Sequence, residues 1–148
     1  MWIVPDFIKH CLEDILTVQW TKHIPLIQPQ SPAELAGDAI LDALNNIPDI
    51  DTTDWMIVDF CSGSGGPVPM IEILINHGRE ISGKKPIPVR LSDLHPNLDA
   101  WIELAALSEN LSFIPQAVDA RCPPFSVMGK VFRLFCLALH HFDDRAAQ

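Results

Sequence analysis

The sequence predicts an α/β fold with a parallel sheet of about four strands and flanking helices. Short apolar runs alternate with segments of helical periodicity between residues 55 and 139, and this alternation is typical of parallel sheets. The run at residues 55–60 is apolar at nearly every position, as expected of a strand buried on both faces. Right-handed crossovers would place helices on both faces of the sheet and so provide that burial.

Composition and charge limit the possible partners. The chain has 148 residues, of which 48% are hydrophobic, enough for one domain with a buried core. Its formal net charge of −9 repels phosphate backbones, so we expect no nucleic-acid partner. No apolar run approaches the roughly 20 residues of a membrane helix, and the first residues lack a basic n-region. The four cysteines form no CxxC pair, which favours reduced thiols in a cytoplasmic protein without a membrane partner.

The chain divides into two parts. Residues 1–30 are expected to form an N-terminal helical extension, because apolar residues recur there at helical spacing. Residues 31–148 are expected to form the main domain, which starts with a well-marked helix. Ser31 and Glu34 have the spacing of a capping box, and Pro32 suits the first helical turn.

The domain then reads as strands separated by helices. The expected strands are residues 55–60, 88–93, 111–118 and 131–139. Residues 68–76 should be a helix that is buried nearly all round, with Gly78 as its C-cap and residues 79–86 as a polar loop. Pro96 opens a further helix. We expect its apolar stripe to belong to the core, and this stripe consists of Leu98, Trp101, Ile102 and Ala105.

The most informative segment runs from Val58 to Gly66 and reads VDFCSGSGG. An apolar strand ends near Asp59, and a loop that contains Gly63 and Gly65 precedes a helix. Glycines allow positive φ and let a ligand approach the backbone closely. Free N–H groups at a helix start attract anions. In an open parallel sheet such a loop lies at the carboxyl ends of the strands, where ligands bind.

An acid followed by small residues at alternate positions (Asp59, Cys61, Gly63 and Gly65) resembles the first motif of class I, Rossmann-like, S-adenosylmethionine-dependent methyltransferases. Cys61 departs from the family, which usually has glycine there. The resemblance implies S-adenosylmethionine as cofactor and a strand order of 3-2-1-4. It also implies that the methionyl end of the cofactor binds along this segment, at Asp59, Cys61, Gly63, Ser64, Gly65 and Gly66.

Two further acids follow in the order typical of the family. Asp93, followed by Leu94, ends the second strand and resembles the acid that binds both ribose hydroxyls, a task suited to two acceptor oxygens. Asp119, followed by Ala120, comes after the third strand and resembles the acid that accepts from the adenine amino group. Structural alternatives stay open, because Asp93 could stabilise a helix start and Asp119 could form a turn.

The fourth strand is followed at once by His140 and His141, and many members of the family have an apolar run and His-His at this place. Either histidine could act on the methyl acceptor, although a local structural role is an alternative. Adjacent histidines have a poor spacing for a metal site, so we expect no metal. No base accompanies Cys61 in the sequence, which disfavours a nucleophilic role for this residue. Arg133, in the fourth strand, stands where the family often has Asp.

The family usually has seven strands, and only four residues follow Asp144. We therefore expect an incomplete, truncated methyltransferase fold. The strand from Val131 to Leu139 would then be an apolar edge that invites a homo-oligomer or another partner.

The sequence favours methyl transfer from S-adenosylmethionine to a small-molecule acceptor, or the cofactor-binding portion of such an enzyme. A non-catalytic methyltransferase-like binding module is one alternative. An NAD(P)-binding domain is disfavoured, because Val68 stands where its fingerprint has a third glycine. The acid of the second strand also follows the loop later than the roughly 20 residues expected in that fingerprint.

Overall fold

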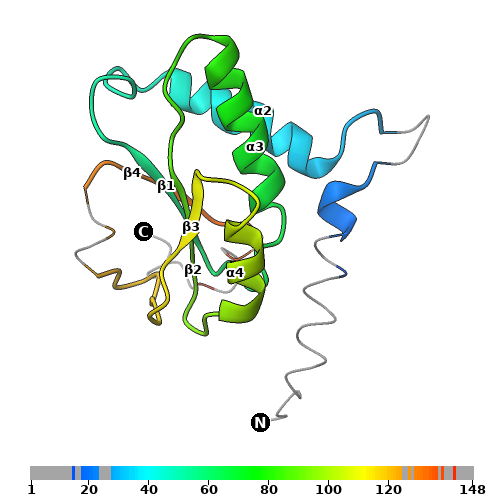
Figure 1. The fold of residues 1–148 in the computed structure, drawn as a ribbon, viewed down its shortest axis with the longest axis vertical. Coiled ribbons are helices and arrows are strands. Elements are labelled where there is room, and N and C mark those ends of the chain that lie inside the picture. Colours follow the sequence, from blue (N-terminus) through cyan, green and yellow to red (C-terminus); the bar gives the residue numbers. More distant parts are fainter. Residues whose placement is uncertain are drawn as a thin grey trace.

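The computed structural model describes residues 15, 18–23, 28–124, 127, 129–136, 138 and 142. Its sheet has four parallel strands in the order β3-β2-β1-β4, which confirms the predicted α/β fold and strand order (Figure 1). The strands are β1 (Met56–Phe60), β2 (Val89–Ser92), β3 (Leu111–Phe113) and β4 (Val131–Leu134). The helices are α2 (Pro32–Asn45), α3 (Val68–Ile81) and α4 (Leu98–Ala105).

The two faces of the sheet are covered differently. Ile57 of β1 belongs to a core cluster that contains buried residues of all three helices, such as Leu44, Ile75 and Trp101. Val58, the next residue of β1, points to the other face and packs with residues of the segment between β3 and β4. Among the described residues, helices therefore cover one face of the sheet, not both as the alternation predicts, and an irregular segment covers the other.

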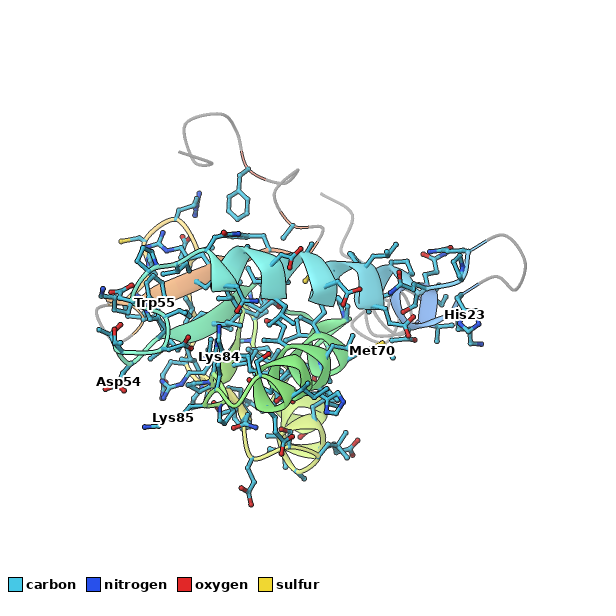
Figure 2. All side chains as sticks on the ribbon, turned by 90° about the horizontal axis from the view of Figure 1, so that it is seen from above. His23, Asp54, Trp55, Met70, Lys84 and Lys85 are labelled. Atoms are coloured by element: carbon cyan, nitrogen blue, oxygen red, sulfur yellow. The ribbon has the colours of Figure 1, made fainter. Side chains whose placement is uncertain are left out.

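Helix α2 starts as the sequence predicts. The Ser31 side chain accepts from the Glu34 backbone N–H at 3.2 Å, and the Ser31 backbone N–H donates to the Glu34 carboxylate at 2.5 Å. This reciprocal pair is a capping box. Figure 2 shows α2 and α3 lying side by side, and Gly37 provides the close approach, because a Cβ there would lie 3.1 Å from Leu74 of α3.

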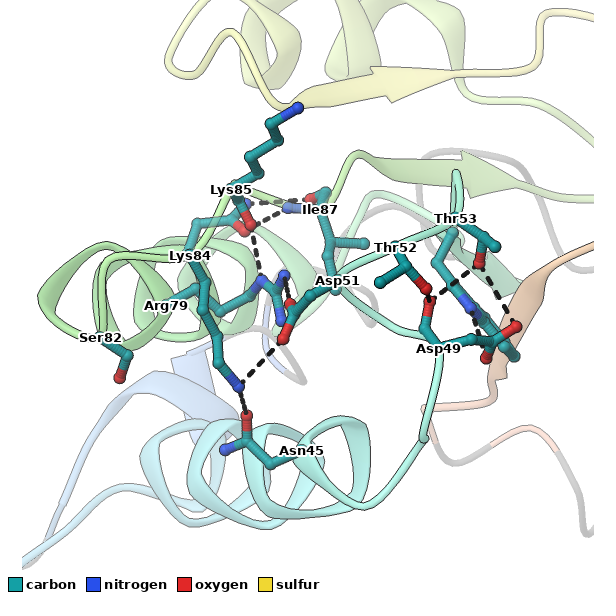
Figure 3. Close-up of polar contacts among 12 residues, drawn as sticks. Asn45, Asp49, Asp51, Thr52, Thr53, Arg79, Ser82, Lys84, Lys85 and Ile87 are labelled. Carbon is teal, nitrogen blue, oxygen red and sulfur yellow. Dashed lines mark hydrogen bonds and ion pairs between the residues drawn. The ribbon is translucent and has the colours of Figure 1, made fainter.

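The predicted end of α3 is wrong. The helix continues to Ile81, so Gly78 lies inside it and is not its C-cap, and Arg79 belongs to the helix and not to a polar loop. A Cβ at Gly78 would lie 2.5 Å from Leu41 of α2, so the glycine permits close helix packing. Arg79 is buried because Asp51 accepts from its guanidinium at 2.7 Å (Figure 3). Ile73 is 56% exposed, so residues 68–76 are not buried all round as predicted.

The predicted strands are longer than the observed ones, and the predicted core stripe of α4 includes exposed residues. Ordered pairing of β3 ends at Phe113, two residues before Pro115, which cannot donate to a strand ladder. Pairing of β4 ends at Leu134, and β4 is the last strand of the described sheet. In α4, Trp101 is buried, but Leu98 and Ile102 are 39% and 58% exposed. This short helix packs through one face, so the rest of its stripe is not core.

The N-terminal extension is described only in part. Residues 15 and 18–21 are helical, and most of the expected helix lies outside the described residues. Within the described residues, no helix has the length and apolar character needed to cross a membrane.

Candidate functional site

The loop after β1 has an unusual backbone. Cys61, Gly63, Gly65 and Gly66 have φ values of 62°, 51°, 103° and 48°. Cys61 is the only described residue other than glycine with a positive φ, and this conformation costs an L-residue about 1–2 kcal/mol. The small residues at alternate positions therefore have a physical reason, because the backbone is left-handed at each of them.

Hydrogen bonds hold this loop against β2 and α4. The Gly63 N–H donates to Oδ2 of Asp93 at 3.0 Å, and the Gly63 carbonyl accepts from Nε1 of Trp101 at 2.8 Å. The Ser62 N–H donates to the Ser92 carbonyl at 3.0 Å, and the Ser92 N–H donates to the Ser62 hydroxyl at 3.1 Å. Trp101, predicted only as core, also anchors the loop.

The second half of the loop packs against α4. A Cβ at Gly65 would lie 2.4 Å from Cδ1 of Leu104, so only glycine fits there. A Cβ at Gly66 would meet nothing within 4 Å, which leaves the backbone open on this side. Ser64 accepts from the Asn97 side-chain amide at 3.0 Å.

Asp59 is a buried carboxylate at the carboxyl end of β1. It is 1% exposed, and neither carboxylate oxygen has a hydrogen-bond partner among the described residues. Burial raises the pKa of Asp59 to about 7. Ser62 and Cys136 lie near enough to lower that pKa in part, although neither completes a hydrogen bond with the carboxylate. The proximity of Cys136, which follows β4, was not apparent from the sequence.

Asp93 follows β2 and is partly exposed. One of its oxygens accepts from Gly63, and the other accepts from the His95 N–H at 2.8 Å. Each carboxylate oxygen has two lone pairs, so each can accept one further bond. Leu94, which was predicted to bind the cofactor together with Asp93, is 47% exposed.

Asp119 is paired with a residue that sequence reasoning missed. Its two oxygens accept from Nε and Nη2 of Arg121 at 3.0 and 2.7 Å, and the Arg121 N–H also donates to it at 2.9 Å. These bonds lower the pKa of Asp119 to about 2. Ala120 is partly exposed. The spacing of Asp and Arg two residues apart, in a predicted turn, was the available signal.

Three carboxylates influence the pKa of one thiol. Burial raises the pKa of Cys61 to about 11, together with the negative charges of Asp93, Asp59 and Asp119. The segment of Asp119 is held next to β2, because the Val118 N–H donates to the Asp93 carbonyl at 2.8 Å. Acids from three different places in the sequence thus lie near enough to Cys61 to raise its pKa, and the thiol is neutral at physiological pH.

Other sequence predictions cannot be placed. His140 and His141 lie outside the described residues. Within the described part of the chain, no three His, Cys, Asp or Glu side chains are grouped so that they could hold a metal ion.

Comparisons of this chain with protein-family models, with curated proteins and with solved structures found no match. A function is therefore inferred from the carboxylate-lined loop, which comprises residues 61–66 with Asp59, Asp93 and Asp119 beside them.

Proposed function

We propose that this chain binds S-adenosylmethionine at the carboxyl edge of its sheet and carries the cofactor-binding part of a methyltransferase. The observation that supports this most is that Asp59 and Asp93 lie at the carboxyl ends of β1 and β2, beside a left-handed loop, with the segment of Asp119 bonded to Asp93. An adenosyl sulfonium presents a positive charge, two ribose hydroxyls and an adenine amino group. A carboxylate complements each of these groups, as a counter-charge or as a hydrogen-bond acceptor.

The residues fit this cofactor to different degrees. Neither oxygen of Asp59 has a hydrogen-bond partner among the described residues, so a cationic methionyl end nearby would offset the cost of burying it. Asp93 keeps one acceptor site on each oxygen, which suits a pair of ribose hydroxyls. Asp119 fits less well, because an adenine amino group would have to share its oxygens with Arg121.

The chemistry asks little of the protein side chains. S-adenosylmethionine supplies an activated methyl group, so the protein mainly orients the reactants and excludes water. No nucleophilic side chain is needed, and Cys61 with its raised pKa provides none. The methyl acceptor that we propose is a small molecule.

A non-catalytic binding module is the second proposal, and Cys61 favours it. Its backbone is left-handed where the family usually has glycine, and the charges of the three acids act on its thiol. Cofactor binding without methyl transfer to any acceptor would support this module over the enzyme.

A dinucleotide is the ligand that the electrostatics disfavour, because Asp93 beside the loop and the net charge of −9 repel a diphosphate. Thermal unfolding with S-adenosylmethionine, S-adenosylhomocysteine or NADH at equal concentration tests the proposal. We expect the first two ligands to raise the Tm and NADH to leave it unchanged. A shift with NADH alone would refute S-adenosylmethionine as the cofactor.

A further inference from the structure

A line of polar side chains runs along the buried face of α3. Glu72, Asn76 and Arg79 are 2%, 8% and 1% exposed. Asn76 donates to the Ile87 carbonyl at 3.1 Å and accepts from the Ile87 N–H at 2.8 Å, while Nε of Arg79 donates to the Lys85 carbonyl at 2.8 Å (Figure 3). These bonds tie the segment before β2 to the helix.

The two charges in this line are compensated differently. Arg79 forms an ion pair with Asp51 at 2.7 Å. Glu72 accepts from the Asn76 amide through Oε1 at 2.8 Å, but its Oε2 has no partner among the described residues. Removing a carboxylate from water without a cation costs several kcal/mol by general estimates. Glu72 is therefore a buried acceptor that lacks a donor.

Glu72 lines a cavity of about 410 Å³, a size typical of small-molecule sites. The other lining residues include Ile73, Asn76, Glu80, Pro86 and Asn110. Lys84 and His77 also line this cavity.

Lys84 does not neutralise Glu72, because its ammonium binds Asn45 at 2.8 Å and Asp51 at 3.3 Å. Among the described residues, one carboxylate oxygen of Glu72, in the wall of this cavity, therefore has no hydrogen-bond partner.

We propose that this cavity binds a small organic cation with N–H donors, an alkylammonium or a guanidinium. The last side-chain torsion of a glutamate is soft, so the Glu72 carboxylate can turn toward a bound donor. Glu80 and the Asn110 amide provide further acceptors, and Ile73 and Pro86 contact the carbon part of the ligand. The net charge of −9 attracts cations to the chain.

This site is separate from the carboxylate-lined loop. Met70, near the start of α3, and Lys84, after its end, lie apart in Figure 2. The loop precedes the start of α3, whereas the cavity is lined by the later part of the helix and by residues that follow it. Its ligand can therefore be tested independently of the proposed cofactor.

Titration of the full chain with n-butylammonium and methylguanidinium, followed by ligand-observed NMR, tests this proposal. Butyrate and n-butanol serve as anionic and neutral controls of similar size. We expect both cations to bind and both controls to fail. Glu72→Gln should weaken cation binding about tenfold, because it replaces a charged acceptor by a neutral one.

Two further variants complete the design. Ile73→Trp changes a residue that is 56% exposed, so it should block the cavity without disturbing the core, and cation binding should be lost. Glu103→Gln removes an exposed acid of α4 and should bind as the unmodified chain does, with folding checked by circular dichroism.

Equal binding of n-butanol, no cation binding, or unchanged affinity in folded Glu72→Gln or Ile73→Trp would overturn the proposal.

Discussion

The backbone N–H of Gly63 donates to Oδ2 of Asp93 at 3.0 Å, across 30 residues of sequence. This bond fixes the glycine loop of the first strand to the acid of the second. Asp93 therefore has two tasks in the proposed site, because it shapes the loop and offers its remaining lone pairs to a ligand.

Replacing Asp93 by Asn should weaken the binding of S-adenosylhomocysteine at least about tenfold, because charged acceptors form the stronger hydrogen bonds. Isothermal titration of the variant measures this. Asp99→Asn, which removes an exposed acid in the first turn of α4, is the matched control and should bind normally. Equal affinities of the two variants would contradict the assigned role of Asp93.

Gly65→Ala should lower the free energy of unfolding more than Gly66→Ala. Both positions have positive φ, which costs an alanine about 1–2 kcal/mol. At Gly65 the new Cβ would also lie 2.4 Å from Leu104, whereas at Gly66 it meets nothing within 4 Å. Urea unfolding compares the two variants, and similar losses would argue against the packing of this loop on α4.

Cys61→Gly should raise the free energy of unfolding by up to about 1 kcal/mol, because glycine relieves the left-handed strain and loses part of that gain to unfolded-state entropy. Cys61→Val should lower it, since a β-branched residue tolerates this backbone poorly. Urea unfolding of both variants and of the unmodified protein checks this order of stabilities. A Val variant as stable as the Gly variant would mean that the backbone at Cys61 is not left-handed.

Titration of Asp59 should make the free energy of unfolding depend on pH. Burial raises its folded-state pKa from 3.8 to about 7, so between these values the folded protein keeps a proton that the unfolded chain has lost. The contribution of Asp59 to stability is then complete below pH 4 and is lost as the pH rises toward 7. The slope is at most about 1.4 kcal/mol per pH unit.

Asp59→Asn removes this titration and keeps the shape of the side chain. The difference in unfolding free energy between variant and unmodified protein should therefore shift in favour of the variant between pH 4 and 7 and stay constant above. Acids with lowered pKa, such as Asp119 and Asp51, are present in both proteins, so their contributions cancel in this difference. Urea unfolding at four pH values provides the data, and parallel curves would rule out a raised pKa at Asp59.

Features set by a few neighbouring residues could be predicted from the sequence. The capping box of Ser31 and Glu34 is formed by a pair three residues apart, and the structure has both of its bonds. The positions of Asp59 and Asp93 at strand ends follow from the alternation of apolar runs and polar turns. Parallel pairing then brings these ends to one edge of the sheet.

Features that depend on distant contacts could not be predicted. Gly78 resembles a C-cap in sequence, but it lies inside α3, where the lack of a side chain leaves room for Leu41 of α2. The sequence places Arg79 in a polar loop, because the ion pair with Asp51 that allows its burial is not visible in the local pattern. In the site, Cys136 after β4 lies near enough to Asp59 of β1 to affect its pKa, and the apolar pattern does not encode this proximity.

Calorimetric titration of the folded chain with S-adenosylhomocysteine tests the central proposal most directly. The placement of three acids at the carboxyl edge of the sheet, beside the left-handed loop, predicts saturable binding of one ligand per chain, which Asp93→Asn weakens and Asp99→Asn does not. Absence of binding at millimolar ligand, by a sample shown to be folded, would contradict it.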